Sequence, residues 1–254
     1  MPPSRTTPLQ EIIELALLAG LLVHQSGGDT ARTSATIRRM ALALGASRAD
    51  TVVSSLNIGV TIEQGSARET AFRKAPHMGA NFTMLTAVAQ VVEAVEEQKL
   101  NAQSARCQLE DIARQPQRYP HWLIALLVGV SCGGFAALFG GDPVAILCTT
   151  LGSSIGMALR LFLHRRHYVP FMFAFASSLT AMLITGLLLK LAHSNTQEEA
   201  MAASVLFLIP GVPFINGAAD LFHANYLNGM VRIMMGVLFV IGIAVGVSLA
   251  LRIL

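Results

Sequence analysis

Five apolar runs follow one another in the C-terminal half of the sequence, and they restrict the fold of this chain more than any other feature. Each run is close to the ~20 residues that a helix needs to cross a bilayer. Backbone groups inside a bilayer must be satisfied within the segment itself, so the runs predict membrane-spanning helices. They cover about residues 122–140, 143–163, 169–192, 200–221 and 229–252.

The charged residues are concentrated in the other half of the chain. Residues 1–118 hold 12 of the 18 lysines and arginines and 11 of the 15 aspartates and glutamates, which leaves six and four for residues 119–254. The whole chain is 53% hydrophobic and 13% charged, about half the usual charged share of a soluble protein. The sequence therefore predicts a polar domain, residues 1–118, followed by a five-span transmembrane domain, residues 119–254.

The polar domain has the pattern of a small α+β fold. Apolar residues at helical spacing predict a helical hairpin over residues 9–44, interrupted at Gly27 and Gly28. Period-two alternation from residue 51 to residue 62 predicts one strand, and residues 66–73 are expected to return as a second strand. Helical spacing then resumes from residue 82 and again near residues 102–114. The fold class is thus a mainly α-helical membrane protein with a small α+β domain at its N-terminus.

Loop charges predict the orientation in the membrane. Arg106, Arg114 and Arg118 precede the first span, and residues 164–167 place two arginines and two histidines between the second and third spans. The two remaining loops before the fourth span carry no lysine or arginine. Residues 1–13 also lack the pattern of a signal peptide. The positive-inside rule therefore places the N-terminal domain in the cytosol and the C-terminus on the other side.

The segment from residue 206 to residue 232 carries the most unusual features. Prolines and a glycine interrupt an apolar run there, and amides and charged groups follow. Such a segment is typical of a transporter binding site, because interrupted helices offer unpaired backbone groups. Charged side chains inside a membrane are also energetically costly and are usually functional. The predicted substrate or ion pathway consists of Pro210, Gly211, Pro213, Asn216, Asp220, Asn228 and Arg232, together with Arg160 from the second span.

Two of these predictions have a structural alternative. Asp220 and Arg232 could pair with each other and simply close a hairpin at the inner end of the fourth and fifth spans. Arg160 lies near the cytosolic end of its span, where its side chain could either reach the interface or face an anionic substrate. The sequence leaves both questions open.

The other motifs are better explained by helix packing, helix capping or a basic surface than by catalysis or metal binding. Residues 152–156 match the GxSxG pattern of a nucleophile elbow, but they lie inside a predicted span, where small residues serve helix packing. His164 and His167 bracket two arginines that would oppose a metal ion, and Asp29 is placed to cap a helix. No metal, cofactor or catalytic residue is predicted, and the dispersed net charge of +3 argues against nucleic-acid binding.

The chain resembles the ThrE-type threonine/serine exporter family, and within it the YjjP-like branch of bacterial inner-membrane proteins. The most specific matching stretch is Ala200–Phe222, with Asn228, Gly229 and Arg232 after it. Further matches are the turn at residues 28–30, where the family usually has Glu at Asp29, residues 61–65, Arg73, Asn81 and residues 118–132.

The resemblance implies a cytosolic domain followed by five spans, in a multi-pass protein of the bacterial inner membrane with a periplasmic C-terminus. It also implies a small multi-span YjjB-like partner that supplies a second set of spans, and export of succinate or a related dicarboxylate. Threonine or serine remains the alternative substrate, because the charges of Asp220, Arg160 and Arg232 suit either. Homo-oligomerisation is left open. A membrane-embedded hydrolase or a non-transporting scaffold is the alternative of another class.

Overall fold

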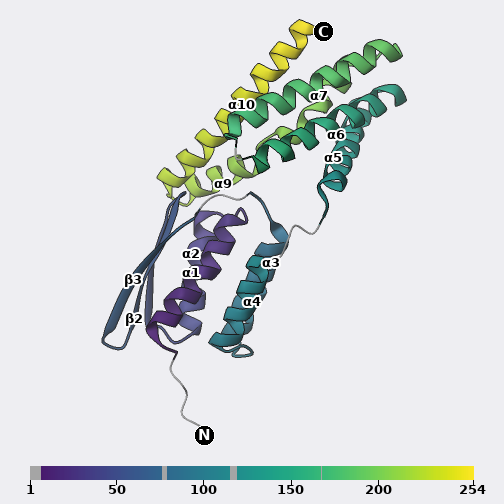
Figure 1. The fold of residues 1–254 in the computed structure, drawn as a ribbon. Coiled ribbons are helices and arrows are strands. Elements are labelled where there is room, and N and C mark those ends of the chain that lie inside the picture. Colours follow the sequence, from purple (N-terminus) through teal and green to yellow (C-terminus); the bar gives the residue numbers. More distant parts are fainter. Residues whose placement is uncertain (1–6, 76–78, 115–118, 167) are drawn as a thin grey trace. The chain divides into compact units, whose positions relative to one another are not determined.

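The computed structural model describes residues 7–75, 79–114, 119–166 and 168–254. These residues are mainly helical and include one small sheet (Figure 1). The chain divides into two compact units, which are described one at a time: unit 1 comprises Met1–Pro116 and Val212–Ile233, and unit 2 comprises Gln117–Gly211 and Met234–Leu254. Arg118, at the boundary that the sequence predicts between the two domains, lies outside the described residues.

Unit 1 begins with two packed helices. α1 (Leu9–Gln25) and α2 (Thr30–Ala43) form the helical hairpin that the apolar periodicity predicts. Gly27 turns the chain between them with a φ of 88°, a conformation that glycine adopts without steric cost. Asp29 caps α2, because its carboxylate accepts a hydrogen bond of 2.6 Å from the amide of Arg32.

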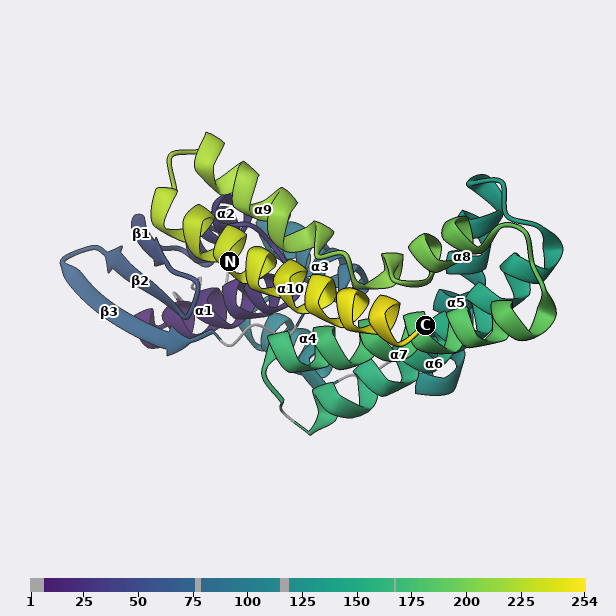
Figure 2. The same cartoon turned by 90° about the horizontal axis from the view of Figure 1, so that it is seen from above.

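Three antiparallel strands form the sheet of unit 1 in the order β1-β2-β3 (Figure 2). They are β1 (Arg48–Val53), β2 (Asn57–Gln64) and β3 (Ala67–Lys74). β2 is therefore the central strand. Its register runs from Val53↔Ile58 to Arg48↔Glu63 with β1 and from Asn57↔Lys74 to Gln64↔Ala67 with β3.

The single strand expected over residues 51–62 is wrong, because the chain reverses within that range. β1 ends at Val53, and the amide of Ser54 donates a 2.8 Å hydrogen bond to the carbonyl of Asn57 across a tight turn. The apolar alternation happens to continue through this turn. Leu56 is consequently exposed, whereas Ile58, Val60 and Ile62 on β2 are buried.

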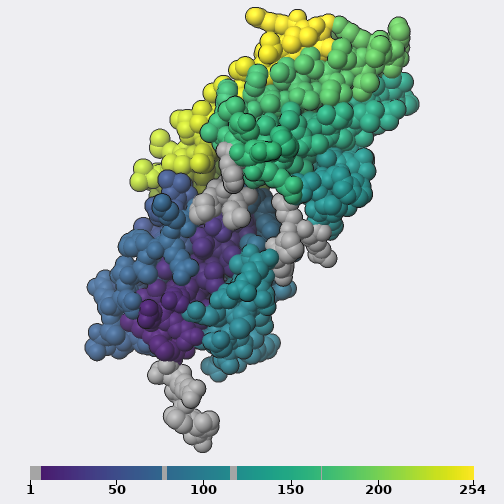
Figure 3. Space-filling view, viewed as in Figure 1, coloured from purple at the N-terminus to yellow at the C-terminus, as the bar shows by residue number. Residues whose placement is uncertain are grey.

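The core of unit 1 forms around α1. This helix contacts α2, β2 and β3, and also α3 (Phe82–Glu96) and α4 (Ala102–Arg114). Figure 3 shows α1 in purple, with the blue sheet on one side and the teal α4 on the other. The largest fully buried side chains come from α1, α2, α4 and β2: Ile12, Leu15, Leu17, Val23, Ile37, Met40, Leu109, Ile58, Val60 and Ile62.

In the described part of the chain, four helices are each long and apolar enough to cross a membrane. They are α5 (His121–Leu138), α6 (Pro143–Arg165), α7 (Pro170–Ala192) and α10 (Tyr226–Ile253), and they correspond to the first, second, third and fifth apolar runs. The first three belong to unit 2, and the boundary between the units falls inside α10.

The fourth apolar run, expected as one span over residues 200–221, is not a continuous helix. It consists of α8 (Gln197–Ser204), the 3-10 turn η1 (Leu206–Leu208) and α9 (Gly211–Phe222), and the helix is broken at residues 209–210. Pro210 has no amide hydrogen, and its ring blocks the preceding turn, so the helix cannot run through it. Counting this bent pair as one span gives five spans, and otherwise there are four among the described residues.

Glycines allow the helices of unit 2 to pack at close range. A Cβ on Gly133 of α5 would lie 3.1 Å from the carbonyl oxygen of Ile146 on α6, and one on Gly246 of α10 would lie 2.6 Å from that of Phe175 on α7. Contacts this short leave no room for a side chain. Small residues at these two positions therefore let the helices pack closely at both places.

Candidate transport site

The parts of two helices that lie in unit 1 bring the polar residues of the 206–232 segment together. α9 and α10 are joined by a turn in which Ala224 adopts a left-handed φ of 60°. Figure 2 shows α9 beside the first turns of α10. A Cβ on Gly229 would lie 2.8 Å from the carbonyl oxygen of Gly217, so the two helices pack backbone to backbone. This close approach places Asp220 of α9 beside Arg232 of α10.

Asp220 and Arg232 form a buried ion pair. The Nε atom of Arg232 lies 3.1 Å from Oδ2 of Asp220, and the two side chains are 9% and 1% exposed. Either charge alone in this position would suffer a desolvation penalty of several kcal/mol. Each charge therefore offsets part of the desolvation penalty of the other.

The ion pair also contacts the turn between α1 and α2. The Oδ1 atom of Asp220 accepts a 3.0 Å hydrogen bond from the amide of Thr30, the first residue of α2. Helix N-termini carry unsatisfied amides and a partial positive charge, so a carboxylate is favourable there. Arg232 donates from Nη2 to the carbonyl of Gly28 at 3.1 Å. The pair thus joins α9 and α10 to the start of α2.

Two asparagines extend this contact. Asn216 donates to the carbonyl of Gly27 at 2.7 Å. Asn228 donates to the hydroxyl of Thr30 at 3.1 Å and to the carbonyl of Val53 at 2.8 Å. These bonds satisfy backbone carbonyls that the glycine turn and the end of β1 leave free. We call the set the Asp220 cluster: Thr30, Asn216, Asp220, Asn228 and Arg232.

Four of the eight residues predicted for the pathway therefore meet in one cluster. Pro213 lies in the first turn of α9, while Pro210, Gly211 and Arg160 belong to unit 2. Of the two interpretations of Asp220 and Arg232, the pairing is observed, and a role in transport stays a prediction. The partners of this pair in the turn at residues 27–30, and the contact of Asn228 with Val53, were not predicted from the sequence. The adjacent Gly27 and Gly28 were a usable signal, because a glycine turn exposes carbonyls to side chains.

A second series of polar contacts lies in unit 2, along one face of α6. Thr149 donates from its hydroxyl to the carbonyl of Ala200 at 3.1 Å, and Ser153 donates to that of Ser204 at 2.9 Å. Residues 149, 153 and 160 share one helical face by their spacing. We call Thr149, Ser153 and Arg160 the α6 ladder. It supplies hydrogen-bond donors to the irregular segment formed by α8 and η1.

The last member of the α6 ladder meets a carbonyl that the helix break releases. Arg160 donates from Nη1 to the carbonyl of Phe207 at 3.0 Å. In a continuous helix this carbonyl would accept from the amide of Gly211, but that amide donates to Ile209 instead, at 2.9 Å. Pro210 has no amide to offer. The break at Pro210 therefore creates the acceptor that Arg160 uses.

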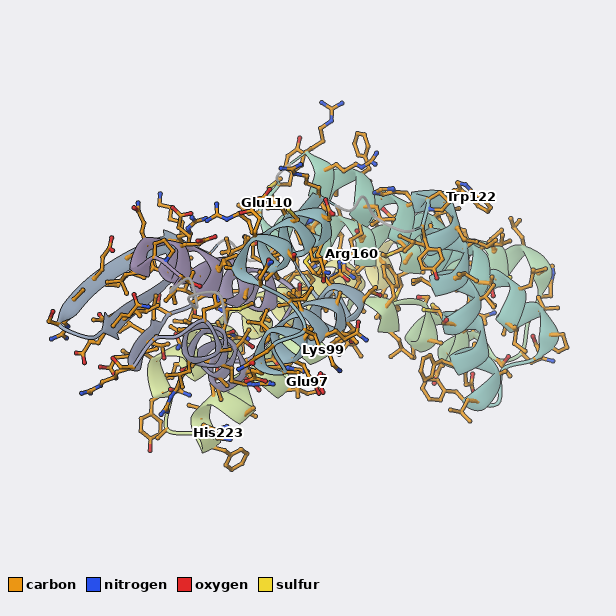
Figure 4. The ribbon with its side chains drawn as sticks, turned by 90° about the horizontal axis from the view of Figure 1, so that it is seen from below. Glu97, Lys99, Glu110, Trp122, Arg160 and His223 are labelled. Carbon is orange, nitrogen blue, oxygen red and sulfur yellow. The ribbon has the colours of Figure 1, made fainter. Side chains whose placement is uncertain are left out.

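The charge of Arg160 has no acidic partner among the residues that the structure describes. Its guanidinium carbon lies 5.8 Å from the centre of the Phe239 ring, within range of a cation–π contact. No aspartate or glutamate of the described ranges lies within ion-pair distance of it. Figure 4 labels Arg160, together with Trp122 near the start of α5, which is 67% exposed as suits an interfacial aromatic residue.

The GxSxG motif is part of the helix packing. Residues 152–156 lie wholly within α6, without the strand-to-helix turn that a nucleophile elbow needs. A Cβ on Gly152 would lie 2.9 Å from the carbonyl oxygen of Ala181, and one on Gly156 would lie 2.8 Å from its Cβ. Both glycines therefore allow α6 to pack closely on α7, and Ser153 belongs to the α6 ladder.

The segment at the end of α6 that contains His164 shows no metal site in its described part. The ring of His164 packs edge-on against Phe173, with 5.9 Å between ring centres. His167 lies outside the described residues. Across the ranges that the structure describes, no three His, Cys, Asp or Glu side chains are placed to hold a metal ion.

Asp142 links two loops of unit 2. It caps α6 by accepting a 2.7 Å hydrogen bond from the amide of Ala145, and it also accepts a 2.9 Å bond from the hydroxyl of Ser194. The amide of Asp142 in turn donates to the hydroxyl of Thr196 at 2.9 Å. These donors, the Ala145 amide first, lower the pKa of the Asp142 carboxyl, because they bond to its charged form.

Comparison with known proteins places the chain in a family. A profile described as "Putative threonine/serine exporter", ThrE, matches residues 14–254. The chain belongs to the ThrE family. It is 34% identical over 250 residues to a protein of Escherichia coli named "Probable succinate transporter subunit YjjP", and the match covers 98% of this chain and 97% of that protein. A protein of the same name from Klebsiella aerogenes is 32% identical over 241 residues, which cover 94% of this chain and 93% of that one.

The ThrE match confirms the family resemblance read from residues 200–232. The four apolar helices and the membership in an exporter family together identify the chain as a membrane protein. A more distant match is a "Pheromone-regulated membrane protein 10" of Eremothecium gossypii, 22% identical over 175 residues, or 67% of this chain and 24% of that protein. No solved structure matches the chain.

Proposed function

We propose that this ThrE-family chain is a subunit of a secondary exporter that moves small carboxylates, succinate or a related dicarboxylate, out across the bacterial inner membrane. The observation that carries the proposal is the break at Pro210, where an arginine without an acidic partner in the described part of the chain meets a carbonyl freed from its helix. Broken helices with free backbone groups are the usual binding elements of secondary transporters. The names of the two bacterial relatives support the choice of succinate.

The proposed pathway consists of the residues predicted from the sequence: Pro210, Gly211, Pro213, Asn216, Asp220, Asn228, Arg232 and Arg160. Within it, Asp220 is the residue proposed to carry the coupling proton or ion. A buried carboxylate that bonds to Thr30 and Arg232 would change its contacts on protonation, because a neutral acid no longer balances the arginine. The opening of the Asp220 cluster is thus proposed as the coupled step.

The proposed topology follows from the loop charges. The N-terminal domain would lie in the cytosol and the C-terminus in the periplasm, in agreement with the positive-inside rule. The word "subunit" in the names of both relatives supports a partner protein. We propose that the partner is a small multi-span YjjB-like membrane protein that completes the pathway.

The test is reconstitution in proteoliposomes of the full chain together with this small subunit. Radiolabelled succinate should move in response to an imposed proton gradient, and Asp220→Asn should abolish the gradient dependence, whereas the exposed control Asp111→Asn should transport as the wild type does. Transport of threonine but not of succinate would replace the substrate. Complete absence of solute transport by an assembled complex would overturn the exporter function, and full transport by the single chain would overturn the need for the partner.

A further inference from the structure

A cavity lies beside Arg160 inside unit 2. It has a volume of about 290 Å³ and is bordered by α5, α6 and η1. Ligand pockets in proteins begin at about 300 Å³, so this space suits a small molecule. Most of its walls are apolar or weakly polar: Val128, Ser131, Cys132, Phe135 and Met157.

Among the described residues that line this cavity, Arg160 alone carries a formal charge. A guanidinium has five N–H donors in a planar fork. One bond, to the carbonyl of Phe207, anchors the side chain at the cavity wall, and the Phe239 ring lies 5.8 Å from the guanidinium carbon. Further donors remain for a ligand, and the surrounding apolar wall would strengthen their interaction with an anion. A planar fork fixed in this way matches the two oxygens of a carboxylate.

The lining contains no acidic residue. None of the described residues that line the cavity is Asp or Glu, so the cavity offers no carboxylate to pair with an ammonium group. A zwitterionic amino acid would have to bury its ammonium group without a counter-charge from these residues, which is unfavourable. A carboxylate with an aliphatic body avoids this penalty.

We infer that the cavity beside Arg160 binds one carboxylate group of a small aliphatic acid and discriminates against α-amino acids. This inference rests on the proposed function, since it assigns part of the export pathway to named residues. One guanidinium compensates one carboxylate. The second carboxylate of a dicarboxylate such as succinate is therefore held outside this cavity, and an aliphatic monocarboxylate competes for the same position.

The test is direct binding, measured separately from transport. The full chain is placed in lipid nanodiscs, with and without the small subunit, and binding of radiolabelled succinate is displaced by unlabelled butyrate, threonine or butylamine. Butyrate should compete and the other two should not. Arg160→Gln should weaken binding roughly 10- to 100-fold, the effect of losing a charge-assisted hydrogen bond. The matched control Arg166→Gln, an exposed arginine at the end of α6, should bind as the wild type does.

A second variant guards against a folding defect in Arg160→Gln. Val128→Phe keeps the guanidinium and its bond to Phe207 but fills the cavity, so it should also abolish binding while the thermal unfolding temperature stays near that of the wild type. Unchanged binding in both variants would overturn the inference and leave the exporter function intact. Equal competition by threonine would overturn the selectivity. Displacement of succinate when anionic phosphatidylglycerol replaces zwitterionic phosphatidylcholine would show a site for an anionic lipid headgroup and would also overturn it.

Discussion

Arg232 in unit 1 and Arg160 in unit 2 are both held away from solvent in a mainly apolar sequence, yet their charges are compensated differently. Arg232 lies 3.1 Å from the carboxylate of Asp220 and also bonds to the carbonyl of Gly28. Arg160 bonds to a single carbonyl and lies against an aromatic ring. The first arginine is internally neutralised and serves an interface. The second leaves its charge available to a ligand.

The largest expected effect comes from making the same substitution at both arginines. Arg232→Met leaves Asp220 as an uncompensated buried charge and should destabilise the protein by about 3–5 kcal/mol. Arg160→Met loses one hydrogen bond but also removes a lone charge from the interior, so its cost should stay below about 2 kcal/mol. Thermal unfolding in one detergent, followed by circular dichroism, compares the two. The exposed Arg252→Met is the control.

Equal losses of stability in the two variants would contradict this difference, because Arg160 would then be compensated by the protein itself. The double variant Asp220→Leu with Arg232→Met tests the role of the pair as a whole. Replacing a whole buried ion pair by apolar side chains is often neutral, so this variant should recover most of the stability lost in Arg232→Met.

A smaller effect is expected next to Arg160 on the α6 ladder. Ser153→Ala leaves the carbonyl of Ser204 without its donor and should cost about 1–2 kcal/mol of stability, while transport is retained. Ser154→Ala is the matched control, because the Ser154 hydroxyl has no hydrogen-bond partner among the described residues. Thermal unfolding and the proteoliposome assay measure both. Loss of transport in Ser153→Ala at unchanged stability would restore a chemical role for the GxSxG serine.

The smallest effect on stability is expected at Asp142, whose carboxylate is stabilised by hydrogen bonds. The donors around Asp142, the Ala145 amide first, hold its folded pKa below the ordinary value of about 3.9. The stability from this carboxylate is therefore fully present above that value and is lost as the pH falls through the lowered folded pKa. Asp142→Asn should flatten the acid limb of thermal stability, measured from pH 5 downwards, whereas the exposed Asp111→Asn should not. An unchanged acid limb in Asp142→Asn would contradict this account.

The helices were readable from the sequence because their signals are local. Apolar periodicity and length correctly predicted α5, α6, α7 and α10, and the Asp29 cap and the glycine turn were also local features. The turn after Val53 was missed, because alternation of apolar residues looks the same whether a strand continues or reverses. The prolines predicted an interruption of the helical hydrogen bonds near Pro210. The length of the interruption could not be predicted, because it depends on which neighbours replace the lost hydrogen bonds.

The membrane character, the family and the residues with unusual chemistry follow from the sequence, since composition, spacing and resemblance are properties of the chain alone. How each charge is compensated depends on the fold. Asp220 meets Thr30 across 190 positions of sequence, and Arg160 meets Phe207 across 47. A charge in an apolar sequence must be neutralised, and its partner is set by distance in space, which no local pattern encodes.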